Sequence, residues 1–494
     1  MNVSRRFFIG GLAGFGLNRL FAAAPGVFTD GQPALTFGVL SDVHVSLAKG
    51  GEKLAKGYDT ATLVHAFEWF RDRKVDAVVI AGDMAHCGLL GELKAVADAW
   101  FKVFPGDRAP DGRKVERVFV FGNHDWSGTK RGKPIYGEAP YADQVLANDP
   151  KKCWDACFHE EWKPIFKKEV KGFPFVGAHW SKGGDCNGRC ESFVAGLGDF
   201  YQSIKGELDA ARPFFHVQHP HPRGTVHGPV WGQDDGDSVK ALSAFPNAIS
   251  FSGHSHTSLT DERFIWQGAF TSVGTATLRN VGIGGGILRP KGGYENYTTP
   301  SGKTSKELDA LKTMPPLDRG SCRQGQLVRV YADRVVFSRM EFLTDASLGD
   351  DIVLPLPAAK HRPFEFAARQ AKALAPAFAK GAALALSAKK ARNRGAKKGE
   401  PKKDVLEIVI PPAEAVASAR TWEYEITVAG ASGEPAVFGV IARGFRFGPT
   451  DRRVKESTPC RLAFDRLPPK PLSVSVRAVS CWGRTSEPLK GTFV

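Results

Sequence analysis

Side chains of the types that bind metal ions stand at five separate places in this chain. They are Asp42 and His44 in Leu-Ser-Asp-Val-His, Asp83 in Ile-Ala-Gly-Asp, Asn123, His124 and Asp125 in Phe-Gly-Asn-His-Asp, His219 in Val-Gln-His-Pro, and His254 and His256 in Ser-Gly-His-Ser-His. At four of the five places they directly follow a run rich in Val, Phe, Ile or Leu, the composition of a buried strand. Because ligands bind beyond the carboxyl ends of the strands in an open α/β sheet, we expect these loops to meet around one metal site.

The donor types indicate which metals this site would hold. Imidazole with carboxylate and carbonyl oxygen suits Mn, Fe, Zn or Co better than Ca, which prefers oxygen ligands alone. Seven candidate ligands are too many for one tetrahedral ion, but they suit two ions that share a bridging carboxylate. Such pairs, about 3.5–4 Å apart, recur in phosphatases and nucleases. Taken singly, each residue is most often a turn residue, a helix cap or a satisfied polar group; the ordered set predicts two divalent transition-metal ions.

The five segments together resemble the motifs of the calcineurin-like metallophosphoesterases. The pattern of that family is D-x-H, G-D, G-N-H-D/E, a lone His after a strand, and G-H-x-H, and every part occurs here in order. The resemblance covers about residues 34–342. It implies two facing sheets with helices outside, and hydrolysis of phosphomonoesters or phosphodiesters by in-line attack of a metal-bridging hydroxide.

The same resemblance implies a role for each residue of the set. One metal would take Asp42, His44 and His256, the other Asn123, His219 and His254, and Asp83 would bridge both. His124 resembles the general acid that protonates the leaving oxygen, with Asp125 orienting its ring.

Two other histidines bear on this assignment. His221 follows His219 closely and is a rival ligand or substrate contact, but His219 stands where the strand should end. His86 stands three residues after Asp83, where purple acid phosphatases have Tyr, so we expect no tyrosinate–iron colour.

Apolar periodicity predicts the elements that hold these loops. Strands are expected at 34–42, 75–81 and 118–121, with helices at 60–73 and around 93–101, an alternation typical of a mostly parallel sheet. The stretch 127–172 is expected to be an insertion near the active-site rim. The further strands, which we expect to complete a second sheet, are 173–179, 213–219, 248–252, 270–275, 327–331 and 335–339.

The first residues have the features of an export signal. Arg5 and Arg6 in Ser-Arg-Arg-Phe-Phe-Ile resemble the twin-arginine motif, and a Gly-rich, weakly apolar run follows. We therefore expect 1–24 to be a twin-arginine signal peptide and the protein to be periplasmic or extracellular; an ordinary N-terminal helix is the alternative. No later stretch is long and apolar enough to predict a transmembrane segment.

The composition changes towards the C-terminus. We expect the metallophosphoesterase domain over 30–345, a connector over 346–373 and a smaller all-β sandwich over 374–494. Alternation within 422–428 and 472–478, with Gly and Pro in the turns, is typical of short sandwich strands. The closing segment resembles a fibronectin type III domain, although Leu472 stands where that family often has Tyr. A spacer, packing or partner-binding role is expected for it.

Charge and cysteine content leave two features to interpret. Residues 389–403 hold eight bases and one acid, which is +7 of the formal net charge of +15. They could contact nucleic acid or an anionic surface, but no aromatic residues interleave them, so a solvated turn between strands is favoured and no sequence-specific nucleic acid binding is expected. Cys186 and Cys190 could close a small disulfide loop in an oxidising compartment, and zinc-finger spacing is absent.

These observations support one principal hypothesis, an exported two-metal enzyme that acts on a phosphate ester. The alternative from another class is a non-catalytic module that binds phosphate or a partner. Pseudo-enzymes lose ligands or the acid, whereas all seven ligands, His124 and Asp125 are present here. The sequence therefore favours the enzyme, with monoesters and diesters both open as substrates.

Overall fold

The computed structural model of this chain describes residues 31–48, 53–126, 129–130, 133–134, 145–146, 149–180, 196–209, 211–227, 232–279, 281, 322–391, 401–414 and 420–494. The expected signal peptide and the pair Cys186 and Cys190 lie outside these ranges. No helix within them is long and apolar enough to cross a bilayer.

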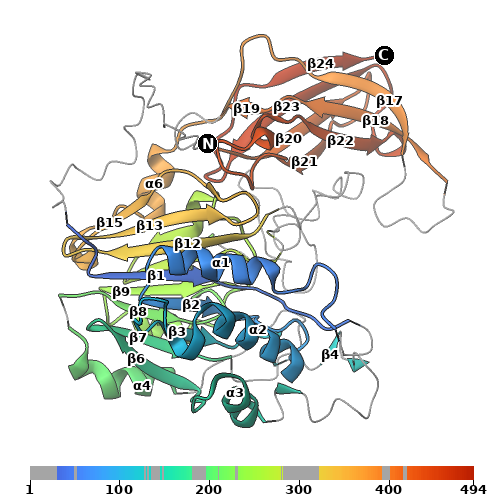
Figure 1. Cartoon of the computed structure of the whole chain (residues 1–494). Helices are drawn as coiled ribbons and strands as arrows, with labels where there is room; N and C mark the ends of the chain where they lie inside the picture. The colour runs from blue at the N-terminus through green and yellow to red at the C-terminus, as the bar shows by residue number, and fades with distance from the viewer. Residues whose placement is uncertain are drawn as a thin grey trace, which may run out of the picture.

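Two sheets face each other in the first domain, and an all-β domain follows (Figure 1). This confirms the expected fold class, an α/β two-sheet sandwich flanked by helices and followed by a smaller all-β sandwich. In spatial order the first sheet consists of β14 (Ala346–Ser347), β13 (Arg334–Glu341), β12 (Gln324–Val330), β1 (Leu35–Leu40), β2 (Ala77–Ala81) and β3 (Glu116–Val120), with β15 (Ile352–Pro355) also paired to β13. The second consists of β10 (Ile265–Gln267), β11 (Thr271–Gly274), β9 (Ala248–Ser252), β8 (Phe214–Val217), β7 (Phe173–Ala178) and β6 (Ile165–Val170).

The strands that precede the motifs run parallel within each sheet. In the first sheet Val39 is opposite Val79, and Val79 is opposite Val118, so β1, β2 and β3 end at the same edge. In the second sheet β7, β8, β9 and β11 are parallel. The loops that leave these carboxyl ends therefore gather the motif residues.

Aromatic side chains fill the space between the two sheets. The ring of Phe37 on β1 lies 5.2 Å from Phe175, 4.8 Å from Phe215 and 5.7 Å from Phe251, all in edge-on geometry. Such pairs stabilise a core beyond the area that they bury. The next residue of β1, Gly38, faces the helices instead and leaves room for the ring of Phe70.

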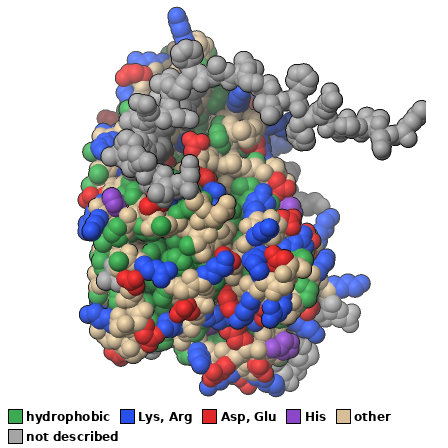
Figure 2. Space-filling model, turned by 60° about the vertical axis from the view of Figure 1, so that its left-hand side comes forward, with side chains coloured by type: hydrophobic (Ala, Val, Ile, Leu, Met, Phe, Trp, Pro, Cys, Tyr) green, Lys and Arg blue, Asp and Glu red, His purple; other side chains and the backbone are tan. Residues whose placement is uncertain are grey.

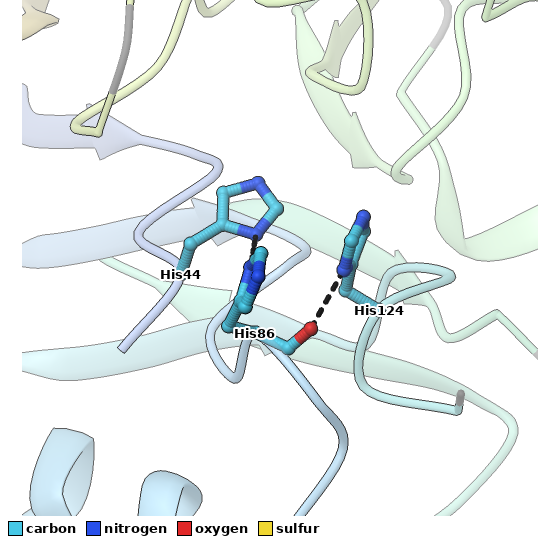
Figure 3. A group of neighbouring side chains, drawn as sticks. All are labelled: His44, His86 and His124. Atoms are coloured by element: carbon cyan, nitrogen blue, oxygen red, sulfur yellow. Dashed lines mark hydrogen bonds between the residues drawn. The ribbon is translucent and has the colours of Figure 1, made fainter. Parts of the chain in front are cut away.

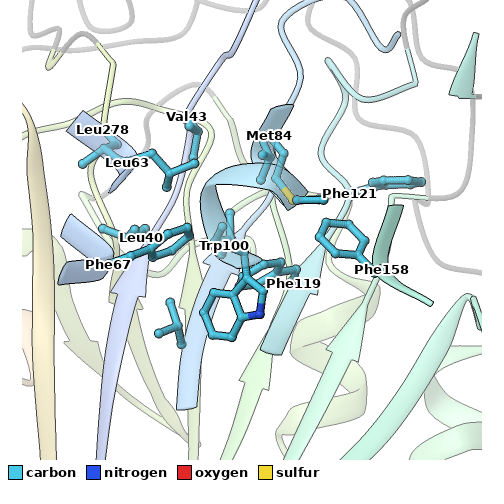
Figure 4. Close-up of a cluster of buried hydrophobic side chains, with 14 of the residues drawn as sticks. Leu40, Val43, Leu63, Phe67, Met84, Trp100, Phe119, Phe121, Phe158 and Leu278 are labelled. Atoms are coloured by element: carbon cyan, nitrogen blue, oxygen red, sulfur yellow. The ribbon is translucent and has the colours of Figure 1, made fainter. Parts of the chain in front are cut away.

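Helices cover the outer faces of the sheets. On the first sheet, the ring centroids of Phe67 in α1 and Trp100 in α2 lie 5.3 Å apart, and both rings pack on Phe119 of β3 (Figure 4). Tyr201 of α4 packs on Phe214 of the second sheet. The helices of this domain are α1 (Ala61–Asp72), α2 (Leu90–Val103), α3 (Pro150–Phe158), α4 (Leu197–Ile204) and α5 (Asp237–Leu242).

Two expectations about this domain are wrong. The hairpin of β12 and β13 extends the first sheet, not the second, because β12 pairs antiparallel with the free edge of β1, with Leu35 opposite Val330. Residues 150–170, within the expected insertion 127–172, are core structure and not part of a rim insertion. Its helix α3 buries Trp154 and Phe158, and β6 is the edge strand of the second sheet.

The C-terminal domain is built from antiparallel sheets. Its core is formed by side chains that alternate along the strands, such as Trp422, Tyr424, Ile426 and Val428 on β20. The stretch expected as a connector carries β14 and β15 of the first sheet and then α6 (Phe366–Lys372). The sheets of this domain are β17 (Ala385–Ala391), β18 (Lys403–Ile410) and β22 (Thr458–Ala463); β21 (Ala436–Ile441), β20 (Thr421–Ala429), β23 (Leu472–Ser480) and β24 (Leu489–Phe493); and the pair β16 (Ala377–Phe378) and β19 (Ala413–Glu414).

The basic segment joins two strands of this domain. Its ends belong to β17 and β18, which pair antiparallel with Ala391 opposite Lys403. Lys389 forms an ion pair with Glu407, and Lys403 lies 2.8 Å from Asp465. These ends therefore fit the expected turn between strands, while residues 392–400 lie outside the described ranges.

Candidate metal centre

The motif loops leave their strands in unusual backbone conformations. Asp42, His44, Asp83, His254 and His256 all have φ between 51° and 69°, the left-handed region that non-glycine residues seldom adopt. Each such residue costs about 1–3 kcal/mol, and such residues cluster at functional sites. The strained loops therefore coincide with the ligands that the sequence predicts.

A first group of ligand atoms surrounds Asp42 Oδ1. His256 Nε2 lies 2.9 Å from it and His44 Nε2 3.7 Å from it. The two imidazole nitrogens are 3.1 Å apart, and His44 Nε2 is 3.6 Å from Asp83 Oδ2. Together Asp42, His44, Asp83 and His256 could hold one metal ion.

A second group lies directly beside the first. His219 Nε2 is 3.2 Å from Asp83 Oδ2, and the rings of His219 and His254 are 4.7 Å apart. Asp83, His219 and His254 could hold a second metal ion. The expected ligand Asn123 is buried in the loop that follows β3. Asp83 belongs to both groups, and its Oδ2 faces one imidazole of each.

Hydrogen bonds on the far side of the ligands fix their direction. His219 Nδ1 donates to the Ala81 carbonyl at 2.7 Å, so Nε2 is the nitrogen turned towards Asp83. Asp42 Oδ2 accepts the backbone N–H of His254 at 3.0 Å, and Asp83 Oδ1 accepts that of His124 at 2.9 Å. Contacts of this kind set the tautomer and orientation of metal-binding side chains.

Two buried polar atoms of the site bear on its fit to metal ions. Among the residues that the structure describes, Asn123 Oδ1 and His219 Nε2 are buried and have no hydrogen-bond partner, although His219 lies close to Asp83. A buried polar atom without a hydrogen bond lowers the stability of the fold by about 1–3 kcal/mol, so its presence needs an explanation. The imidazole and carboxylate donors of the two groups fit divalent transition metals.

Charges in the centre shift the pKa values of its groups. Burial opposes the charged form of His219, but Asp83 and Asp42 raise the pKa of its imidazole to about 9. Burial lowers the pKa of His44 to about 4. Burial and the neighbouring Asp83 raise the pKa of Asp125 to about 8. Protons and metal ions therefore compete for His219.

The expected contact between Asp125 and the His124 ring is not formed. The Asp125 carboxylate accepts the backbone N–H groups of Gly122 and Ala85, both at 2.7 Å, so it fixes the two loops to each other. The His124 ring is held instead by His86, whose carbonyl accepts its Nδ1–H at 2.7 Å (Figure 3).

His86 is the site residue that the sequence analysis left without a role. Its Nδ1 lies 3.3 Å from His44 Nδ1, and its ring stacks on that of His124 with centroids 5.2 Å apart. It lies three residues after Asp83, and this position was the only signal for it. His221 lies outside both groups, because its two ring nitrogens face Ser252 and Ser255 at 2.8 and 2.7 Å.

Comparison with known proteins places this geometry in a family. Residues 35–258, which hold all five motifs, match the family model described as calcineurin-like phosphoesterase. No curated protein sequence matches the chain.

Solved structures with some similarity include proteins of different kinds. A dimetal phosphatase from Danio rerio is 12% identical, with a TM-score of 0.35 over 66% of this chain and 100% of that one. A purple acid phosphatase from yellow lupin seeds is 12% identical, with a TM-score of 0.37 over 65% of this chain and 54% of that one. The anchor protein of the inner membrane complex of Plasmodium is 13% identical, with a TM-score of 0.32 over 65% and 88%. These values are too low to support any further argument, so the assignment depends on the family model and the motifs. Residues 35–258 of this chain therefore form a calcineurin-like metallophosphoesterase domain.

Proposed function

We propose that this chain is a binuclear-metal phosphoesterase. The observation that carries the proposal is the position of Asp83, whose carboxylate belongs to two neighbouring groups of ligand atoms. Two divalent ions, Mn, Fe, Zn or Co, bound there would supply an activated water nucleophile and neutralise charge on the phosphoryl oxygens. The substrate class is a phosphomonoester or phosphodiester.

His124 is the group suited to protonate the leaving oxygen. Its Nδ1–H is engaged by the His86 carbonyl, so a transferable proton would be carried on Nε2. The residue is half-buried, unlike the ligands Asp42 and Asp83, which are buried. Asp125 contributes by holding the loop that carries the acid.

Screening for hydrolysis tests this proposal. The full chain, loaded with Mn, should hydrolyse at least one class among phosphomonoesters, phosphodiesters and nucleotides, and a chelator should abolish the activity. Full metal loading without hydrolysis of any ester would instead support the alternative, a module that binds phosphate or a partner.

Two further proposals concern location and the second domain. We propose that residues 1–24 direct export through the twin-arginine pathway, supported by Arg5 and Arg6. Replacing both with Lys should leave the precursor in the cytoplasm, and unchanged export would refute this signal.

The three- and four-stranded sheets of the second domain support a fibronectin type III-like fold.

Charges of both signs are mixed on one face of the molecule. On the face shown in Figure 2, Lys and Arg side chains are interspersed with Asp and Glu. Electrostatic attraction to a polyanion needs positive charge concentrated on one surface. The described residues on that face do not form such a surface.

A further inference from the structure

A row of half-buried side chains leads away from the proposed acid. Around the metal centre His86, His124 and His256 are half-buried, whereas the other expected ligands are buried. From His124 the row continues to His86, then to Tyr58, whose ring centroid lies 5.1 Å from that of His86. It ends at Arg279, whose guanidinium carbon lies 3.5 Å from the centre of the Tyr58 ring.

Hydrogen bonds hold both Tyr58 and Arg279 to the loop that carries Asp42 and His44. Thr277 Oγ1 donates to the carbonyl of Asp42 at 2.9 Å, and it also accepts the backbone N–H of Arg279 at 2.9 Å. Tyr58 is held from the other side, because its carbonyl accepts the N–H of Ser46 at 3.0 Å. The position of Arg279 relative to the metal centre is therefore fixed by the loop that carries Asp42 and His44.

The charge of Arg279 is not matched by a carboxylate in the described part of the chain. Its guanidinium lies on the face of Tyr58, and within the described residues the edge of the guanidinium is available for hydrogen bonds. Arg334 offers a comparison, since it lies 4.1 Å from the centre of the Tyr331 ring but also binds Asp333 at 2.8 Å. A planar guanidinium fixed on an aromatic face suits bidentate recognition of a carboxylate or phosphate.

We propose that Arg279, stacked on Tyr58, binds a second anionic group of the substrate. The row begins at the acid that would protonate the leaving oxygen, so this group lies on the leaving-group side of the phosphate ester. The inference rests on the proposed function and narrows it to esters whose leaving alcohol carries a carboxylate or another phosphate.

The test compares esters with the same kind of leaving alkoxide. The probes are butyl phosphate, the phosphate ester of 4-hydroxybutanoate, butane-1,4-diol bisphosphate, and their homologues in a series of chain lengths, all with the Mn-loaded full chain. At the matching length an anionic tail should raise kcat/KM about tenfold or more over the uncharged ester, mainly through KM, and high salt should reduce this advantage. The two anionic tails show whether the preferred group is a carboxylate or a phosphate.

Variants identify the residue responsible. Arg279→Gln should remove most of the advantage while leaving butyl phosphate turnover unchanged, and Arg279→Lys should keep part of it. Arg334→Gln is the matched control, because Tyr331 lies at the opposite end of β1 from Asp42. It should leave the advantage intact.

Three results would overturn the inference in distinguishable ways. No advantage for either tail at any length in the wild type would mean that there is no subsite. Equal losses on butyl phosphate and the anionic esters in Arg279→Gln would show a structural role. Failure of the metal-loaded wild type to hydrolyse any probe would refute the proposed function, and the inference with it.

Discussion

His124 and Asp125 are neighbours in the sequence, but they act on different parts of the centre. Asp125 is fully buried and accepts backbone N–H groups from two loops, whereas His124 is half-buried and has one ring nitrogen free of the His86 carbonyl. Removing the His124 ring should therefore affect proton transfer more than the architecture of the site.

The first prediction follows from this difference. His124→Ala should keep both metals and lose about 10²–10⁴-fold in turnover of alkyl phosphates, whose leaving groups need a proton. With nitrophenyl phosphate the loss should be much smaller, because nitrophenolate leaves without one. Steady-state kinetics on both substrates, with metal analysis of each preparation, makes the comparison; equal losses would contradict the acid role.

At the scale of elements, the position of α1 against the first sheet depends on one glycine. A Cβ on Gly38 of β1 would lie 2.5 Å from the Phe70 ring, and that ring is buried in the helix-covered core. Strand β1 cannot move away from α1, because its other face packs on the second sheet through Phe37.

The second prediction uses this close approach. Gly38→Ala should lower the free energy of unfolding by about 1–3 kcal/mol, since α1 must shift. Gly198→Ala is the control: Gly198 is in α4, and its added Cβ would meet no atom within 4 Å. It should be neutral or stabilising, because alanine favours the helix by up to about 1 kcal/mol. Denaturant unfolding measures both, and a Gly38→Ala protein as stable as the wild type would disprove the packing argument.

The elements and loops differ in how far the sequence could predict them. The ligand loops were predictable because their signals are local: at four of the five places, polar ligands directly follow an apolar run. The position of β12 and β13 in the first sheet was not predictable. Alternating apolar residues indicate a strand but not the strand that it pairs with, which here is β1. The roles of Asp125 and His86 also could not be predicted, since the turn after Asp83 decides which groups face them.

At the scale of the whole molecule, the second domain packs close to a ligand loop. Thr260, four residues after His256, donates to the carbonyl of Phe445 at 2.5 Å, and Gln324 Nε2 donates to that of Arg446 at 2.8 Å. Trp482 Nε1 donates to Glu262 at 2.6 Å, and Arg369 donates to the Glu262 carbonyl at 2.7 Å. Of the roles expected for this domain, these contacts support packing against the first.

The third prediction concerns Glu262 at this interface. Burial raises the pKa of its carboxyl to about 7, although Trp482 and Arg369 oppose the shift. The folded state therefore binds the proton more tightly than the unfolded state. This stabilisation is complete below pH 4.5, the usual pKa of a glutamate carboxyl, and is lost as the pH rises through 7, a change on the order of 3 kcal/mol.

Thermal unfolding between pH 5 and pH 8 should detect this loss of stability. Glu262→Gln keeps an acceptor for Trp482, and its Tm should fall less over this range than that of the wild type. The exposed Glu365 offers the control Glu365→Gln, which should behave like the wild type. Identical pH dependence of the Glu262→Gln and wild-type proteins would show that this carboxyl does not titrate in that range.

Metal stoichiometry is the most direct test of the central claim, that two metal ions share Asp83. Elemental analysis of the full chain, with circular dichroism to confirm folding, should find two ions in the wild type and one in each of His256→Ala and His254→Ala. Asp83→Asn should lose both, because a neutral amide is a poor bridge between two cations. An Asp83→Asn protein that keeps two ions, or a wild type that binds only one, would contradict the two-metal centre.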